Sequence, residues 1–130
     1  MKRITIFFIT FHALILHFAL AQDTIRYYYQ DGTLKSKGKV DQHGLKIGTW
    51  FFYYSNGVLN AQEHYSQNQL EGKVYNYYPD GKLKSVEVWQ DDYQTDSAFY
   101  YHQDGGLDKY GIYKTGLYHG IWHFYYESGV

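Results

Sequence analysis

The sequence predicts an all-β protein in which antiparallel β-hairpin repeats form a single elongated, twisted sheet. The first observation is a recurring phrase of the type Tyr-Tyr-x-Asp-Gly, which returns every 24 or 25 residues. The second is a composition of 17 Tyr, 8 Phe and 3 Trp against one Pro and one Met, which favours strands over helices. The glycines of the phrase are Gly32, Gly57, Gly81, Gly105 and Gly129.

Each repeat is expected to contain a strand, a tight turn and a return strand. Residues 50–54 typify the first strand, and the Asn-Gly or Asp-Gly pair that follows tolerates the positive φ of a hairpin turn. A two-residue type I′ turn would place Pro79 in the closing pair, where it lacks an N–H group. A type I turn with a left-handed Gly81 as a bulge suits proline better, and we favour that geometry.

The repeat divides the chain into about four and a half copies. Because an isolated hairpin is marginally stable in water, neighbouring copies are expected to stack and shelter one another, as in a solenoid. The first copy lacks an opening glycine and carries one extra residue before Gly48, as is common for a terminal repeat. The copies span residues 23–47, 48–71, 72–95, 96–119 and 120–130.

Side chains alternate between the two faces of each first strand. The face with Phe51 and Tyr53 is aromatic in nearly every copy, so we assign it to the core. The opposite face varies between copies and is expected to be partly exposed, although alternation alone leaves open which face is wet. Exposed Tyr and Trp are common in interfaces and also stack on sugar rings. The candidate binding residues on that face are Trp50, Tyr54, Tyr78, Trp122 and Tyr126.

The N-terminal segment has the layout of a signal peptide over residues 1–21. Lys2 and Arg3 precede an apolar stretch, and Ala19-Leu20-Ala21 is a small-x-small cleavage site. The alternative is an uncleaved membrane anchor, for which the stretch is short and contains two His. We therefore expect a periplasmic or secreted protein. The absence of cysteine excludes disulfides, thiolate metal sites and lipoprotein attachment.

Composition and motifs argue against several functions. The chain carries 12 Lys and Arg against 13 Asp and Glu. This balance does not predict a basic surface for nucleic acid and gives no strong signal for binding of membrane lipid. No catalytic site, metal site or cofactor motif is recognised. His119 and His123 have the spacing of a helical zinc pair but lie in a predicted strand, and His102 takes a slot that other copies fill with Tyr.

Charged residues receive structural interpretations. Asp91, Asp92 and Asp96 are expected in a solvated crossing between repeats, since the spacing of a calcium loop is missing. Acidic residues are expected mainly in turns and crossings and not at matched positions on one face, which disfavours a paired-carboxylate enzyme. The lysines at 35, 37 and 39 alternate on one strand, which indicates a protected edge or solvent face, or alternatively a small patch for an anionic partner.

The phrase Gly-x-Trp-x-x-Tyr-Tyr-x-x-Gly-x-Leu, complete in residues 48–59 and partial in 120–129, resembles the MORN repeat variant. That variant occurs in bacterial proteins labelled antitoxin-like components of toxin–antitoxin systems. The resemblance implies protein binding, with toxin neutralisation as one form, and no enzymatic activity. Eukaryotic relatives are linked to phospholipids, whereas this chain lacks a basic stripe. An exported protein also departs from a cytoplasmic antitoxin, so an immunity-type role in the periplasm fits better.

Together these observations predict a non-enzymatic exported module that binds a protein partner, with an unknown oligomeric state. The alternatives are binding of glycan or cell wall through exposed aromatic residues, and a structural spacer without a ligand.

Overall fold

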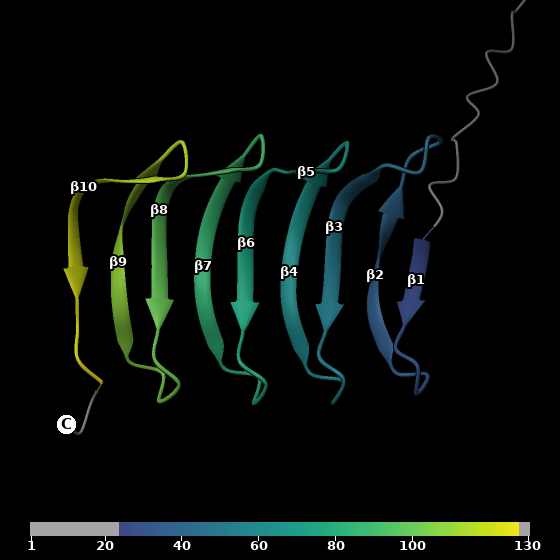
Figure 1. The fold of residues 1–130 in the computed structure, drawn as a ribbon, viewed down its shortest axis with the longest axis horizontal. Coiled ribbons are helices and arrows are strands. Elements are labelled where there is room, and N and C mark those ends of the chain that lie inside the picture. The colour runs from purple at the N-terminus through teal and green to yellow at the C-terminus, as the bar shows by residue number, and fades with distance from the viewer. Residues whose placement is uncertain (1–23, 128–130) are drawn as a thin grey trace, which may run out of the picture.

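A computed structural model describes residues 24–127 as one open antiparallel sheet without helices, which confirms the predicted fold class. The strands lie side by side in a single layer, and the two ends of the described chain lie at opposite ends of the sheet (Figure 1). The signal peptide predicted over residues 1–21 and the turn glycine Gly129 lie outside the described residues. Within residues 24–127, no helix is long and apolar enough to cross a membrane.

The sheet follows the chain in order, and strand β5 is a short start to the strand that β6 continues. The strands are β1 (Thr24–Tyr28), β2 (Leu34–Val40), β3 (Lys46–Tyr53), β4 (Leu59–Ser66), β5 (Gln69–Leu70), β6 (Gly72–Tyr77), β7 (Leu83–Gln90), β8 (Tyr93–Tyr101), β9 (Leu107–Lys114) and β10 (Leu117–Phe124).

The turns within repeats are the predicted bulged type I turns. The Tyr54 carbonyl accepts a hydrogen bond from the Gly57 amide at 2.9 Å, and the Tyr54 amide donates to the Val58 carbonyl at 2.8 Å. Gly57 has a φ of +84°, whereas Asn56 is not among the residues with positive φ. The turn at Gly81 repeats this geometry with a φ of +89°, so Pro79 occupies the position that suits its fixed φ.

The connections between repeats are tighter than the sequence suggested. In place of a polar crossing, Gln67 and Asn68 form a two-residue turn with φ of 49° and 68°, and the pairs at 91–92 and 115–116 do the same. Positive φ at both central residues is the signature of type I′, whose twist matches that of a hairpin. The first copy instead makes a bulged turn ending at Gly44 (φ 79°), which accommodates its extra residue.

A bulge opens the first strand of every later repeat. Gly48, Gly72 and Gly120 have φ of 64°, 83° and 69°, and Asp96, which replaces glycine in the fourth copy, has a φ of 55°. Aspartate tolerates the left-handed region better than most side chains, and the Asp96 carboxylate accepts the Ser97 amide at 2.6 Å. The bulges leave extra residues opposite the return strand before regular pairing resumes.

A row of side-chain hydrogen bonds joins each repeat to the next. The Tyr54 hydroxyl donates to the Tyr77 carbonyl at 2.8 Å, and the Tyr29 and Tyr78 hydroxyls make the equivalent bonds at 2.7 Å. His102 takes the tyrosine slot of the fourth copy and bonds to the Tyr125 carbonyl through Nε2 at 3.0 Å. The histidine therefore keeps the function of the aromatic residue that it replaces.

The buried side chains lie on the face that the sequence had assigned to solvent. We call this the Trp face, since it carries Trp50, Trp89 and Trp122, and call the opposite one the Phe face, since it carries Phe51 and Phe99. The core prediction for the Phe face is wrong, because Phe99 remains 36% exposed. Because the sheet has one layer, a side chain is shielded from water only by neighbouring rings on the same face, and this shielding is most complete around Trp50. The buried residues are Ser36, Trp50, Ala61, Val74, Ser85 and Ala98.

Replacing Gly81 with alanine should destabilise the fold by about 1 kcal/mol, the cost of a left-handed non-glycine residue. An added Cβ would meet only Val58 Cγ1 at 3.8 Å, an ordinary contact, so the cost comes from the backbone. Urea unfolding measures the effect, with Ser55→Ala as a control at a turn position of ordinary φ. Equal stability of the two variants would contradict the bulged turn.

The turn aspartates should make stability depend on pH in the acid range. Backbone hydrogen bonds hold the pKa of Asp31, bonded to the Thr33 amide, and of Asp41, bonded to the Leu45 amide, below the usual 3.8. A lowered folded pKa stabilises the protein above the unfolded pKa, and this contribution disappears as pH falls through the folded pKa.

We therefore expect the double variant Asp31→Asn, Asp41→Asn to lose less stability than the wild type between neutral pH and about pH 2. Asparagine can still accept the amide, as Asn56 does from Val58 at 3.0 Å. Urea unfolding across that range makes the comparison. If the free energy of unfolding depends on pH in the same way in both proteins, the turn carboxylates are not a source of the pH dependence.

Candidate binding surface on the Trp face

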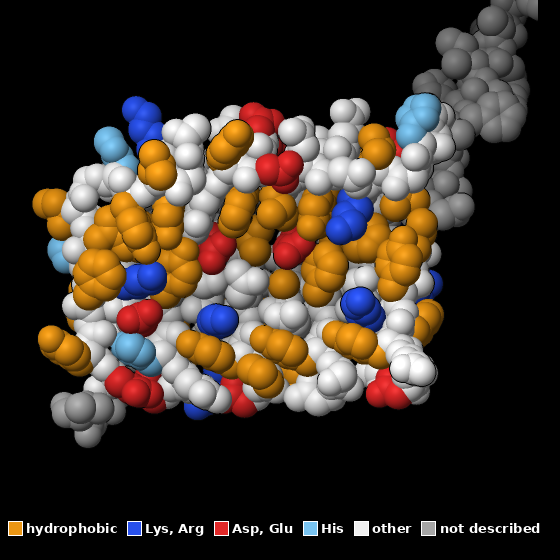
Figure 2. All heavy atoms as spheres, viewed as in Figure 1, with side chains coloured by type: hydrophobic (Ala, Val, Ile, Leu, Met, Phe, Trp, Pro, Cys, Tyr) orange, Lys and Arg blue, Asp and Glu red, His pale blue; other side chains and the backbone are white. Residues whose placement is uncertain are grey.

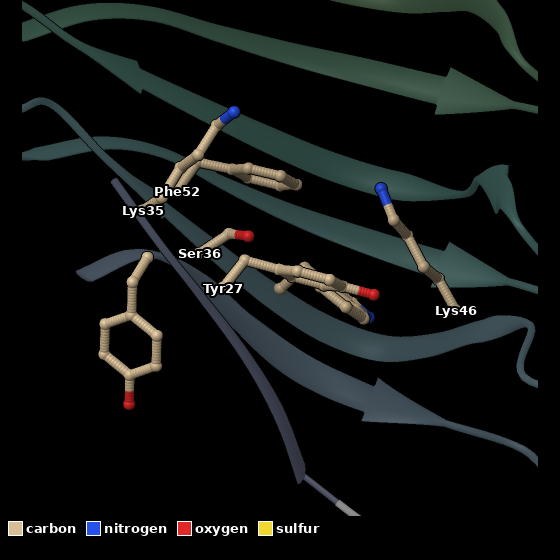
Figure 3. A pocket seen from close by; sticks show the side chains of 7 residues that line it. Tyr27, Lys35, Ser36, Lys46 and Phe52 are labelled. Atoms are coloured by element: carbon tan, nitrogen blue, oxygen red, sulfur yellow. The ribbon is translucent and has the colours of Figure 1, made fainter. Parts of the chain in front are cut away.

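A groove of about 390 Å³ opens at the N-terminal end of the Trp face (Figure 3). Its floor is a stack of rings: Tyr27 lies 6.3 Å from Trp50, which lies 6.2 Å from Phe52, with interplanar angles of 25° and 27°. The groove joins strands β1, β2 and β3. Its lining residues are Tyr27, Tyr28, Lys35, Ser36, Lys46, Trp50 and Phe52.

The Lys46 ammonium lies over this aromatic cluster. Its Nζ is 5.0 Å from the Trp50 ring, 5.2 Å from Phe52 and 4.6 Å from Tyr65. A cation within about 6 Å of several ring faces is attracted to all of them. The N-terminal end of the face therefore combines flat apolar rings with a positive charge at their rim.

Trp50 fits into the sheet because Gly38 faces it. A Cβ at Gly38 would stand 2.2 Å from the indole ring, and the indole N–H donates to the Lys39 carbonyl at 2.9 Å. The ring thus lies against the backbone of β2 and is only 1% exposed. The expectation that Trp50 is an exposed binding residue is wrong, although its neighbours Tyr27 and Phe52 line the groove.

A second cluster forms around Trp122 at the opposite end of the face. A Cβ at Gly111 would stand 2.3 Å from the Trp122 ring, and the indole N–H donates to the Ile112 carbonyl at 3.1 Å. The Trp122 ring meets Tyr118 edge-on at 4.4 Å, and Phe124 lies 6.4 Å away. Because Trp122 is on the outermost described strand, this cluster is more open: Tyr118 is 59% and Phe124 66% exposed.

A lysine also lies over the second cluster. The Lys109 ammonium is 4.7 Å from the Tyr100 ring and 5.9 Å from the Tyr118 ring. The hydrogen bond with Tyr113, and next that with Lys109, lower the pKa of Tyr118, whereas burial raises the pKa of Tyr113. The two ends of the Trp face therefore present the same pairing of aromatic rings and ammonium.

Between the clusters, two glutamates occupy equivalent positions on the Trp face. Glu63 accepts a hydrogen bond from the Tyr65 hydroxyl, and the Glu87 carboxylate accepts from Ser85 Oγ and Trp89 Nε1, both at 3.0 Å. This corrects the expectation that acids avoid matched positions on one face. Figure 2 shows the resulting pattern, with acidic side chains between two groups in which lysine lies among hydrophobic side chains.

The glutamates stand where the tryptophan clusters have glycine. Gly38 and Gly111 face Trp50 and Trp122. Glu63 and Glu87 stand at the same repeat position as these glycines, and they face Val74 and Ala98, which stand at the repeat position of the tryptophans. The two outer pairs set a large ring against no side chain, and the two inner pairs set a small side chain against a large one. Packing on this face is thus complementary across neighbouring strands, while its chemistry changes from aromatic at the two ends to acidic in the middle.

The other predicted binding residues lie at the border of this face. Tyr54 and Tyr78 donate their hydroxyls to the next repeat, and Tyr126, which is 95% exposed, lies beyond the end of β10. Within residues 24–127, no group of three or more metal-ligating side chains is found. Sequence reasoning missed Lys46 and Tyr118. Both occupy one repeat position, which is Leu70 and Gln94 in the middle copies, and this departure was the available signal.

Comparison with known proteins identifies the repeat. Residues 46–67 and 70–91 match the family model described as the MORN repeat variant. The first segment covers β3 and β4, and the second begins at Leu70 and covers β6 and β7, so each contains one bulged strand, one turn and one return strand. No curated protein and no solved structure matches the chain. The match supports the repeat and gives no support to a toxin–antitoxin association.

Replacing Gly38 with alanine should destabilise the protein by about 1–3 kcal/mol, because the indole of Trp50 must leave its site on the backbone. Gly111→Ala should cost less, since Trp122 is less enclosed and can move outward. The double variant Gly38→Ala, Trp50→Val should lose less stability than the sum of the losses in the two single variants, because the two residues interact directly. Urea unfolding measures these variants together with the single variant Trp50→Val, and a purely additive double variant would contradict the contact.

Proposed function

We propose that this chain is a non-enzymatic repeat module that binds a protein partner on the Trp face. The observation that carries the proposal is the open cluster of Tyr118, Trp122 and Phe124, with the Lys109 ammonium at its rim. No second layer covers this face within residues 24–127. Large, rigid rings beside a charge are the usual anchors of protein interfaces.

The size of the surface also favours a protein. Six strand spacings separate β3 from β10, which corresponds to about 29 Å at about 4.8 Å each. That span suits an interface of ordinary size, with an aromatic anchor at each end of the face. Glu63 and Glu87 would then recognise basic or hydrogen-bonding groups of the partner. Both already accept hydrogen bonds from their neighbours, which suits recognition better than proton transfer.

The compartment is part of the same proposal. The layout of residues 1–21 supports export, and a partner would then belong to the cell envelope or its surroundings. An immunity-type role against an exported toxin is one form that such binding could take.

Glycan binding is the second candidate, and the groove at Tyr27 favours it. An exposed Tyr27 ring above Trp50, with Lys35 and Lys46 beside it, offers a stacking platform and two hydrogen-bond donors. A spacer function, by contrast, would need neither cluster.

The test uses the double variant Tyr118→Ala, Phe124→Ala, since both side chains are exposed and their loss should leave the sheet intact. Tyr93→Ala is the matched control, being 57% exposed and outside both clusters. Affinity capture from envelope extract of the native host would identify a partner, and calorimetry with that purified protein would measure affinity. We expect the double variant to bind at least about tenfold more weakly and the control to bind like the wild type.

Unchanged affinity of the double variant would overturn the assignment of the cluster. A glycan array, with Tyr27→Ala as the variant, separates the second candidate. Binding that this substitution abolishes, without any protein partner, would replace the protein-binding proposal by the glycan one.

A further inference from the structure

The Phe face carries a separate groove at its N-terminal end, with a volume of about 240 Å³. Strands β1, β2 and β3 each contribute to it, and three of its side chains are cationic. Its lining residues are Thr24, Arg26, Lys37, Gly38, Lys39, Thr49 and Phe51.

The register of the sheet holds these cations side by side. Arg26 on β1 lies directly across from Lys37 on β2, and Lys39 lies across from Thr24. Like charges directly opposite each other in an antiparallel pair are destabilising. Within residues 24–127, no ion pair joins any of the three to a carboxylate. The arrangement therefore costs stability without a compensating acid in the described chain.

The other repeats show that the fold does not require cations there. The pair Arg26–Lys37 corresponds to Phe51–Gln62, Tyr75–Val86 and Phe99–Tyr110, each in the same register. The position of Lys39 is likewise taken by His64, Val88 and Ile112 in the later copies. All three departures from the repeat introduce a positive charge, and all three line one groove.

Two aromatic rings restrain one of the three cations. The Lys37 ammonium lies over the rings of Phe51 and Tyr53, at 5.5 Å and 5.9 Å from their centroids. These contacts restrain a side chain that would otherwise move freely. Thr24 and Thr49 add two hydroxyl groups, and Phe51 adds an apolar wall.

We propose that this groove binds a phosphate monoester. The guanidinium of Arg26 can hold two oxygens of a tetrahedral oxyanion at once, and Lys37 and Lys39 supply point charges. A phosphate monoester carries a charge of about −1.5 to −2 at neutral pH, which three cations match better than they match a singly charged sulfate ester. The carbon part of the ester would lie against Phe51.

Protection of a sheet edge is the other explanation for exposed cations. It accounts for Arg26 on the outer described strand. It does not account for Lys37 and Lys39, because β2 is paired on both sides.

Titration of the ¹⁵N-labelled full chain with glycerol 3-phosphate tests the proposal by NMR. We expect saturable shifts of the Gly38 and Thr49 amides, weaker shifts with methyl sulfate, and none with glycerol. Co-sedimentation with phosphatidylcholine vesicles, with and without phosphatidic acid, identifies the source of the ester. Pelleting that the groove substitutions abolish assigns it to a lipid, and binding of the soluble ester without pelleting assigns it to a soluble molecule.

The variant replaces the cations by residues that the other copies use, Lys37→Gln and Lys39→Val, so the sheet should remain folded. The control, Lys73→Gln with Lys84→Gln, removes the same charge elsewhere on the sheet. We expect the groove variant to bind glycerol 3-phosphate at least about tenfold more weakly and the control to change by less than about twofold. Equal losses in both variants, or no shift at Gly38 and Thr49 in the wild type, would overturn the site.

Discussion

A sheet of one layer must shelter its apolar surface with its own side chains, and the packing of Trp50 against Gly38 is how this chain does so. The missing side chain on β2 lets the indole lie on the backbone, where its N–H finds a carbonyl and its ring becomes the most deeply buried large side chain described. The bulge at Gly48 adds the residues that bring Trp50 opposite that glycine. Backbone irregularity and aromatic burial are therefore parts of one arrangement.

Periodicity made the backbone predictable. A repeated Asx-Gly pair requires a left-handed residue at a fixed place, and Pro79 selects the bulged type I turn; both arguments depend on local sterics alone. The left-handed residue near the start of each later repeat was recognisable for the same reason, even in the fourth copy, where Asp96 replaces glycine. The crossings were harder, because Gln67 and Asn68 have no glycine to mark their type I′ turn.

The choice of buried face could not be made from alternation. The more uniform aromatic face contains none of the buried residues, because its rings stack beside one another at the surface, as Tyr110 does with Phe99 and His123. The buried residues lie on the variable face because its variation is compensated across strands, glycine against tryptophan and glutamate against valine or alanine. Compensation of this kind involves residues on neighbouring strands, so it becomes visible only once the register is known.

The pairing of Gly38 with Trp50 also crosses a repeat boundary, since one residue belongs to copy 23–47 and the other to copy 48–71. The same holds for Glu63 and Val74. The unit within which side chains are matched therefore consists of the return strand of one repeat and the first strand of the next repeat. Its boundaries are offset from those of the sequence repeat. Duplication or recombination that exchanged whole phrases would place a glutamate side chain where the indole now lies on glycine backbone, whereas exchange at the bulged turns would carry each matched pair intact.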